Sequence, residues 1–388
     1  MKKQIIFFEG NTPTDMCFKM AKTLKGRGYE TVLISILGNF DKNIYNGYNQ
    51  VINFNLNHLN IFKYPYDTFK QLFSNFRLLK LINSIRKLKP YVIIGVVGHP
   101  IFLSATIKKI FKKIPFIYFP YDVISLKYKD INNNYILDKT PKIELKSEKY
   151  CFENADGIIF KGDEFKYVKD MIKTNTPVLQ FLPYCLKENI VPLNENKLSK
   201  KDGELHLVYL GTFADDLWEG LKEILNQKIH LHFYSRQYNL ISHSKKHKFF
   251  LKNKYFHFYK HVSQSKISKE ISKYDFGGWF SSPDFKVYKK EWIGAASGNK
   301  LATFIEAGIP FICSKDMVFI HSIIKKYNLG VAVNKNQMKN LGPLLKKFDN
   351  KKFIENIEIA RKELEFESNI HKLEKFFEDV RKAKKFNN

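Results

Sequence analysis

Two patterns of apolar residues alternate along this chain. Short β-branched or aromatic runs predict buried strands, and longer segments with apolar residues at helical spacing predict amphipathic helices between them. In the amino-terminal half the strand-like runs are Gln4–Phe8, Thr31–Ile36, Tyr91–Val97, Phe116–Phe119, Ala155–Phe160 and Pro177–Leu182. The rhythm restarts with Leu205–Leu210, Ile229–Tyr234, Tyr255–Tyr259, Phe276–Phe280, Phe311–Cys313 and Gly330–Val333. We therefore expect an α/β protein with two doubly wound Rossmann-like domains that face each other across a cleft.

The polarity of the segments between these runs suggests domain boundaries. Residues 186–204 are polar, contain prolines and include the run KLSKKDGE, which is typical of an interdomain linker. We expect an amino-terminal domain over 1–185 and a carboxyl-terminal domain over 205–365. Residues 366–388 are predicted as a charged helix that can return to the amino-terminal domain.

Composition narrows the possible partners. The formal net charge of the 388 residues is +27, which favours anionic partners such as nucleic acid, anionic lipid head groups or phosphorylated substrates. The four cysteines are far apart in sequence and form no CxxC pair, so we expect a reducing, cytoplasmic compartment. No apolar stretch approaches the ~20 residues of a membrane-spanning helix. The protein is therefore expected to be soluble or peripheral on the inner face of the cytoplasmic membrane.

The stretch Ser297–Ser314, which reads SGNKLATFIEAGIPFICS, carries the clearest chemical signal. Ser297 is a natural N-cap, and Gly308 followed by Pro310 is a natural helix stop. This places Lys300 in the first helical turn, where a cation opposes the helix dipole. A bound phosphate would resolve that opposition, because helix amides and a lysine together form an anion cradle. A solvated lysine is the alternative interpretation.

Polar residues follow several of the predicted strands. Ligands of doubly wound sheets bind at the carboxyl ends of strands, where His99, Asp122 and Arg236 are expected. His99 lies where chemistry is expected or caps a loop, and Asp122 can act as a base or stabilise a turn. Arg236, at a strand end facing the cleft, favours an anionic partner.

Other chemical signals are weaker. His230 and His232 alternate on one strand face without a third ligand, so we expect surface positions and no metal. The first strand–helix loop has one glycine where a dinucleotide fingerprint needs three. No Asp-x-Asp sequence, a common metal-binding signature, is present. Trp218 and Trp292 flank the expected ligand loops and either stack on a ligand ring or pack in the core.

Three segments resemble glycosyltransferases of the GT-B fold, with family 4 retaining enzymes as the closest group. SGNKLATFIEAGIPFI resembles the donor-site segment of that family, SEKYCFENADGIIFKGDE resembles the end of its first domain, and LVYLGTF resembles the first strand and glycine loop of its second domain. The order of elements matches over nearly the whole chain. Thr303 stands where the family carries its ribose-binding glutamate, and Glu306 lies one turn further along.

The resemblance implies a retaining sugar transfer without a metal or a cofactor other than the sugar nucleotide itself. The donor would bind mainly to the second domain, and the acceptor would bind to the first. The implied donor-binding residues are Gly211, Thr212, Arg236, Ser297, Asn299, Lys300, Thr303 and Glu306. The implied catalytic residues are His99 and Asp122, and the implied acceptor loop contains Gly10 and Asn11.

The basic clusters add a possible partner. Lys108, Lys109, Lys112 and Lys113 lie near isoleucines and phenylalanines, and Lys245, Lys246 and Lys248 form a second cluster. Such faces suit either an anionic membrane that carries a lipid-linked or surface glycan acceptor, or plain solvent. Two alternative functions stay open: a sugar-nucleotide epimerase of the same fold, and a basic protein that binds nucleic acid or another polyanion. No specific nucleic-acid recognition module is evident.

Overall fold

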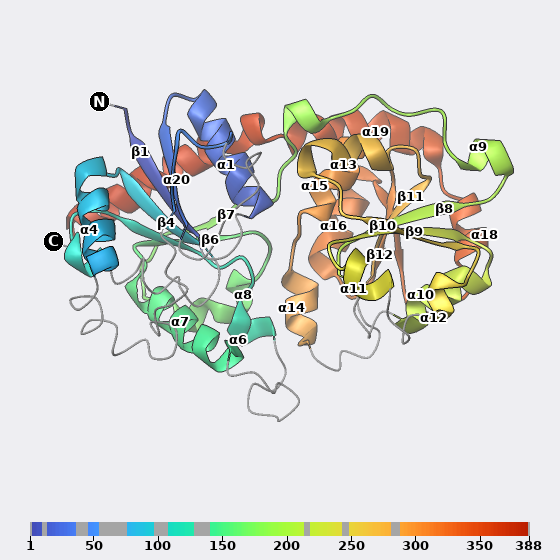
Figure 1. Ribbon diagram of the computed structural model, residues 1–388, viewed down its shortest axis with the longest axis horizontal. Helices are drawn as coiled ribbons and strands as arrows, with labels where there is room; N and C mark the ends of the chain where they lie inside the picture. The colour runs from blue at the N-terminus through green and yellow to red at the C-terminus, as the bar shows by residue number, and fades with distance from the viewer. Residues whose placement is uncertain are drawn as a thin grey trace. The chain divides into compact units, whose positions relative to one another are not determined.

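The chain folds into two compact units (Figure 1). The computed structural model describes residues 2–9, 14–35, 46–53, 76–96, 108–127, 140–212, 218–242, 248–280 and 288–386. The first unit consists of Met1–Leu182 with Asn369–Asn388, and the second consists of Pro183–Ser368. Each unit contains one parallel β-sheet with helices, which confirms the expected pair of doubly wound Rossmann-like domains with carboxyl-terminal helices.

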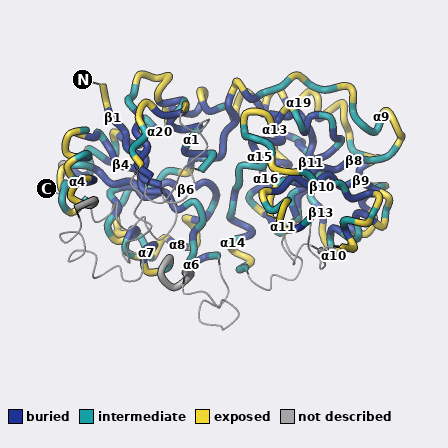
Figure 2. The backbone as a smooth tube through the Cα atoms, viewed as in Figure 1, coloured by how far each residue is buried: buried dark blue, intermediate teal, exposed yellow. Residues whose placement is uncertain are grey.

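The first unit contains a seven-stranded sheet of order β3-β2-β1-β4-β5-β6-β7. Because the chain starts at β1, winds out to β3 and then returns to β4, the strand order reverses between β1 and β4. All residues of β1 and β4 are buried, as expected of parallel strands covered on both faces (Figure 2). The strands are β1 (Gln4–Glu9), β2 (Glu30–Ser35), β3 (Gln50–Asn53), β4 (Val92–Val96), β5 (Phe116–Phe119), β6 (Gly157–Phe160) and β7 (Val178–Gln180).

Helices of the first unit follow the predicted apolar spacing. Thr14 caps the first of them, because its side chain accepts a hydrogen bond from the Cys17 amide at 3.2 Å. The elements are α1 (Asp15–Gly26), α4 (Phe76–Leu88), α6 (Ile124–Lys127), α7 (Thr140–Asn154), α8 (Phe165–Val168) and the 3₁₀ turn η3 (Lys169–Met171). The helix α4 is described from Phe76 onward.

The carboxyl-terminal part of α20 (Phe366–Phe386) packs on the first unit. Gly157, at the start of β6, makes this possible, because a Cβ there would lie 2.5 Å from Val380 and 3.0 Å from Phe376. Polar contacts fix the same stretch: Arg381 donates to the Tyr91 carbonyl at 2.7 Å. The end of the chain therefore completes the core of the unit in which the chain begins.

The second unit contains a six-stranded sheet of order β10-β9-β8-β11-β12-β13. Its strand order reverses between β8 and β11, so the unit repeats the plan of the first. The strands are β8 (His206–Leu210), β9 (His230–Ser235), β10 (Phe256–Lys260), β11 (Phe276–Trp279), β12 (Phe311–Ser314) and β13 (Gly330–Val333). Every strand predicted in this half is present with ends shifted by at most one residue.

The helices of the second unit cover this sheet and extend through the charged tail. They are η4 (Lys187–Asn189), α9 (Ser199–Asp202), α10 (Trp218–Asn226), α11 (Tyr238–Ser242), α12 (Lys248–Leu251), α13 (Gln264–Ile271), α14 (Lys290–Ala295), α15 (Lys300–Ala307), α16 (Val318–Tyr327), α17 (Lys335–Met338), α18 (Leu341–Lys346) and α19 (Asn350–Glu363). Although the tail is rich in charge, Leu341, Phe353 and Ile357 are buried, so one face of it belongs to the core.

Residues 186–204, expected as a linker, lie within the second unit. The Leu186 amide donates to the Glu306 carboxylate at 2.9 Å. Arg361 from α19 donates to the Val191 carbonyl at 2.8 Å and to the Ile305 carbonyl at 3.0 Å. These contacts fix the segment against α15, so it forms part of the wall of the unit.

Two further expectations concern the chain as a whole. All four cysteines are buried thiols without a disulfide. Among the described residues, no helix is long and apolar enough to cross a membrane.

Candidate functional site

A cavity of about 320 Å³ opens in the second unit, beyond the carboxyl ends of β8 and β9. Its volume lies at the lower end of the range for small-molecule sites, roughly 300–1,000 Å³. It sits where ligands of doubly wound sheets bind. The lining residues are Leu210, Gly211, Thr212, Tyr234, Ser235, Arg236, Gln237, His261, Val262, Gln264, Ile267, Asn299, Lys300 and Thr303. Six of the eight residues named as a donor site from the sequence therefore border one cavity.

Lys300 is the first residue of α15, as the sequence predicts, and it lines this cavity. The Nζ atom lies 4.2 Å from the centroid of the Tyr209 ring and 5.7 Å from that of Trp279. Burial lowers the pKa of Lys300 to about 7. No carboxylate pairs with Lys300 in the part of the chain that the structure describes. A cation that is partly removed from water and has no anion beside it is unfavourable, and a bound anion would relieve it.

Gly211 brings the backbone close to this lysine. Its φ of +136° is a conformation that residues with a Cβ rarely adopt, and its amide donates to the Tyr234 carbonyl at 3.0 Å. An added Cβ would lie 3.5 Å from both Nζ and Cε of Lys300. The β8 turn and the start of α15 thus form one continuous surface around the lysine.

The start of α15 differs in one respect from the prediction. The residue that precedes the helix is Asn299 rather than Ser297, and it makes no side-chain capping bond. Ser297 is 2% exposed and does not line the cavity. The Ser297 Oγ and the Asn299 Oδ1 are buried and find no hydrogen-bond partner among the described residues. Asn299, which lines the cavity, therefore keeps its side-chain oxygen available for a ligand.

Thr303 and Glu306 have different surroundings. Thr303 lines the cavity, and its hydroxyl donates to the Asn299 carbonyl at 3.1 Å. Glu306 is fully buried and outside the lining, where it accepts from the Leu186 amide at 2.9 Å and from the Ser268 hydroxyl at 3.0 Å. The sequence-based suggestion that Glu306 contacts the donor is therefore wrong, because both carboxylate oxygens face the protein interior.

Arg236 lines the cavity. The sequence-based argument that its charge needs an anionic partner does not hold, however. Its side chain is exposed, so water already solvates the charge and no anionic partner is required. Burial, together with the charge of Arg236, lowers the pKa of neighbouring His261. His261 is therefore neutral at neutral pH, and the positive charge at the rim of the cavity comes from Arg236.

Asp122 lies in the first unit after β5 and is held by two lysines. Its carboxylate is 2.8 Å from Lys127 Nζ and 3.2 Å from Lys161 Nζ. Burial favours the neutral acid, but the charges of Lys161 and Lys127 outweigh burial and hold the pKa of Asp122 well below its usual range. A carboxylate stabilised in this way is a weak proton acceptor, which contradicts a role as general base. His99, Gly10 and Asn11 lie outside the described residues.

Glu9 is a candidate that the sequence interpretation missed. It ends β1, next to the point where the strand order of the first sheet reverses, and it is 1% exposed. It accepts hydrogen bonds from the Thr14 amide at 2.8 Å and from the Tyr48 hydroxyl at 3.1 Å. Burial nevertheless raises the pKa of Glu9 to about 8. The sequence signal for this candidate is an acidic residue directly after the apolar run IIFF.

The prediction that His230 and His232 are surface residues is wrong for His232. His232 is 4% exposed, and both histidines stack with further histidines from β8 and β10. Burial and the neighbouring histidines lower the pKa of His232 to about 2, so its ring is neutral. The sequence does not show which strands pair with one another, and it is this pairing that brings the rings together.

A second cavity, in the first unit, is basic. Its volume is about 500 Å³, and its lysines are Lys108, Lys109, Lys112, Lys173 and Lys384. Asp156 is within 2.9 Å of Lys108 and 2.8 Å of Lys384, while Lys109 and Lys112 form no ion pair with a carboxylate of the described residues. The first of the two lysine clusters noted in the sequence thus borders a cavity. In the second cluster, 243–247 lie outside the described residues.

No protein-family model matches this chain, and no curated protein sequence matches it. Several solved structures, in contrast, align with this chain. TarM aligns with a TM-score of 0.59 and 10% identity, over 97% of this chain and 99% of TarM. The glycotransferase of kitacinnamycin aligns with a TM-score of 0.52 and 11% identity, over 98% and 99% of the two chains. The UDP-GlcNAc 2-epimerase of Methanocaldococcus jannaschii, solved with UDP-GlcNAc and UDP, aligns with a TM-score of 0.51 and 12% identity, over 92% and 98%.

These similarities cover nearly the whole length of every chain compared, but the sequence identity is low. They therefore establish the fold alone. The chain has the GT-B-like architecture of two Rossmann-like domains with carboxyl-terminal helices, which a glycotransferase and a UDP-GlcNAc 2-epimerase share.

Proposed function

We propose that this protein is a glycosyltransferase, similar to family 4 retaining enzymes, that moves a sugar from a nucleotide-diphosphate donor to a hydroxyl group. The observation that carries the proposal is Lys300, a half-buried lysine at the start of α15 whose pKa is lowered and which pairs with no carboxylate among the described residues, in a cavity at the carboxyl ends of β8 and β9. A diphosphate supplies the anion that this environment lacks.

The chemistry of the reaction explains why such a lysine is useful. When the glycosidic bond to the donor phosphate breaks, negative charge develops on the departing nucleoside diphosphate. A fixed cation and backbone amides that face this charge stabilise the transition state more than the ground state. Loss of one comparable contact in other oxyanion sites costs about 2.7–4 kcal/mol. Lys300 is the proposed main contact, supported by the Thr212 backbone, by the close approach that Gly211 allows and by Arg236 at the rim.

The nucleoside is proposed to contact the remaining lining. The Asn299 Oδ1 is buried without a described partner, and Thr303 lies one turn along the same helix. These groups are suited to the hydroxyls of a ribose. Ser297 would support the loop before α15 rather than touch the donor, because it does not line the cavity.

An epimerase acting on a sugar nucleotide is the second candidate, and the observation in its favour is the similarity to the epimerase of Methanocaldococcus jannaschii. Both reactions need the same diphosphate site, so binding alone does not separate them. Epimerisation breaks a C–H bond of the sugar, and in D₂O the product would carry deuterium. A transferase leaves the sugar hydrogens unexchanged and consumes donor only with an acceptor.

Donor binding is tested by thermal unfolding with UDP, GDP, CMP and ADP. A nucleotide at ~100 times its Kd stabilises by ~2.7 kcal/mol, which is an easily measured shift. We expect one of them to stabilise the natural chain and to lose this effect in Lys300→Met, which removes the charge and keeps the length. Lys325→Met on α16 is the control, because Lys325 is exposed and outside the cavity. Absence of any shift in the natural chain, or equal shifts in both variants, would refute the proposed site.

The acceptor is proposed to be a surface glycan or a lipid-linked glycan at the inner face of the cytoplasmic membrane. The support is the basic cavity of the first unit, where Lys109 and Lys112 offer positive charge. We expect sedimentation with vesicles that contain phosphatidylglycerol but not with pure phosphatidylcholine. Lys109→Glu with Lys112→Glu should abolish this sedimentation and leave nucleotide binding unchanged. Equal sedimentation with both lipids would contradict the membrane proposal.

A further inference from the structure

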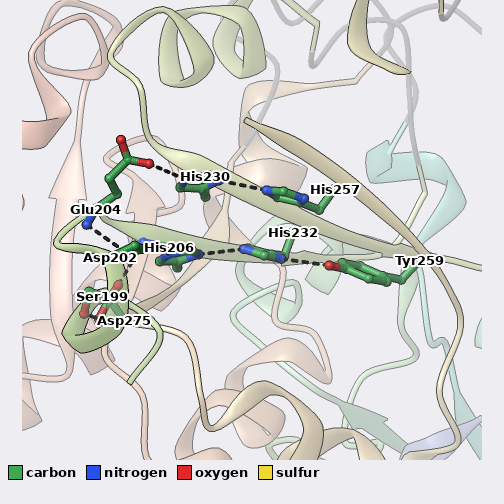
Figure 3. A network of polar contacts seen from close by, with 9 residues as sticks. All are labelled: Ser199, Asp202, Glu204, His206, His230, His232, His257, Tyr259 and Asp275. Carbon is green, nitrogen blue, oxygen red and sulfur yellow. Dashed lines mark hydrogen bonds and ion pairs between the residues drawn. The ribbon is translucent and has the colours of Figure 1, made fainter. Parts of the chain in front are cut away.

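Four histidines gather at the opposite end of the second sheet from the cavity. His206 begins β8, His230 and His232 lie at the start of β9, and His257 lies near the start of β10. Their rings stack, with centroids 4.5 Å apart for His206 and His230 and 4.4 Å apart for His232 and His257 (Figure 3). The mechanism proposed above uses none of them.

Two rows of hydrogen bonds run from carboxylates through these rings (Figure 3). In the first row, Asp202 Oδ2 lies 2.9 Å from His206 Nε2, and His206 Nδ1 lies 2.8 Å from His232 Nε2. In the second row, Glu204 Oε2 lies 2.5 Å from His230 Nε2, and the other ring nitrogen of His230 lies 2.8 Å from His257 Nε2. Each row therefore presents a carboxylate and an imidazole Nε2 at its outer end.

We propose that Asp202, His206 and His230 bind a divalent transition-metal ion, with Zn²⁺ as the ion whose ligand preferences fit best. One ligand atom from each of the three residues lies within 4.8 Å of the other two. Ligands about 2.1 Å from a tetrahedral Zn²⁺ lie about 3.4 Å from one another, so the three side chains would move closer together on binding the ion. Two imidazoles and a carboxylate are a ligand set that Zn²⁺ uses.

The residues behind the ligands support this assignment independently of the ligands themselves. A histidine that binds a metal through Nε2 carries its proton on Nδ1 and donates it to an outer partner. His206 Nδ1 faces His232 Nε2, and His232 in turn faces the Tyr259 hydroxyl at 3.3 Å. His230 faces His257 in the same way. Both proposed ligands thus have an acceptor in the position that fixes the required tautomer.

The carboxylates are arranged to reach the ion. The Glu204 amide donates to Asp202 Oδ1 at 3.0 Å, which leaves Oδ2 directed toward His206. The Asp202 and Glu204 side chains are 44% and 43% exposed, so an ion can enter from solvent. Glu204 already contacts His230 Nε2, and it or a water molecule would complete the tetrahedron.

This site would stabilise the fold rather than take part in sugar transfer. Asp202 ends α9, whereas His206 and His230 come from two neighbouring strands. An ion bound by all three would tie the segment that precedes β8 to the sheet, and binding to the folded chain alone stabilises it. The donor cavity lies beyond the opposite ends of the same strands, so the two sites can be tested separately.

The test uses full-length protein without a histidine tag, treated with a chelator and then dialysed. Titration with ZnCl₂ alone, followed by calorimetry and by thermal unfolding, should show one bound ion per chain and a higher Tm. Co²⁺ should give the visible absorption of a tetrahedral site. His230→Gln and Asp202→Asn should each weaken Zn²⁺ binding about 100-fold or more, and His257→Ala about 10–100-fold through the outer contact. His321→Gln on α16 is the control.

Asp202→Asn changes an exposed side chain, so it tests the site even if a buried histidine variant fails to fold. Zn²⁺ binding equal in Asp202→Asn, His230→Gln and His321→Gln would overturn the proposal, as would absence of stoichiometric binding to the natural chain. Nucleotide-induced stabilisation should be the same with and without Zn²⁺. Loss of nucleotide binding in Lys300→Met with retained Zn²⁺ binding would show that the two sites are independent.

Discussion

At the scale of single residues, the most informative group is the Lys300 ammonium. Its pKa is about 7 because burial disfavours the charged form, so at pH 8 most free molecules carry a neutral lysine. A bound diphosphate raises this pKa, and binding at pH 8 therefore takes up close to one proton. Because the free protein must be protonated on binding, affinity falls as pH rises above 7, by at most about tenfold per pH unit.

Calorimetry in buffers of different ionisation enthalpy measures this proton uptake directly. Lys300→Arg is the matched control, because arginine keeps its charge throughout this pH range. Its binding should be independent of pH above 7 and should take up no lysine-linked proton. Equal proton uptake at pH 8 by the natural chain and Lys300→Arg would show that another group titrates.

Single residues also mark the limit of prediction from sequence. Lys300, Gly211 and Thr303 could be chosen because they stand in short segments whose spacing fixes their place at a strand end or a helix start. Glu306 could not be separated from them, since its partners, Leu186 and Ser268, come from distant parts of the chain. Long-range contacts decide whether a polar residue faces a ligand or the interior, and local pattern does not contain them.

At the scale of elements, α15 is held by contacts behind the cavity as much as by its own sequence. Glu306 accepts two hydrogen bonds from buried donors, and Arg361 donates to the Ile305 and Glu306 carbonyls. Gly308 ends the helix in the left-handed region with a φ of +65°. The strands and this helix were predictable from apolar runs, capping signals and turns, whereas the attachment of 186–204 to α15 was not.

Glu306→Ala should therefore destabilise the second unit without touching the ligand. It leaves the Leu186 amide and the Ser268 hydroxyl without their acceptor, and unpaired buried groups each cost about 1–3 kcal/mol. Urea unfolding should show a lower midpoint with an unchanged slope. At temperatures where the variant is folded, its nucleotide Kd should be within about threefold of the natural value. A much larger loss of affinity would mean that Glu306 acts on the donor after all.

At the scale of the whole molecule, the chain crosses between two units and returns, since Asn369–Asn388 belong to the unit that starts at Met1. Each unit has its own parallel sheet and its own buried core, so each is expected to unfold as a cooperative body. The candidate donor residues all lie in the second unit, and α20 completes the first. A ligand of the donor site should therefore stabilise the second unit alone, and a mutation in the core of one unit should destabilise that unit alone.

Differential scanning calorimetry tests this separation with one ligand and one variant. Val380 is fully buried over Gly157, and Val380→Ala should lower the stability of the first unit by about 2 kcal/mol. The stabilising nucleotide should raise only the transition of the second unit, because binding acts on the state that contains the site. If both transitions move together with either change, the two units unfold as one, and the donor site depends on the first unit as much as on the second.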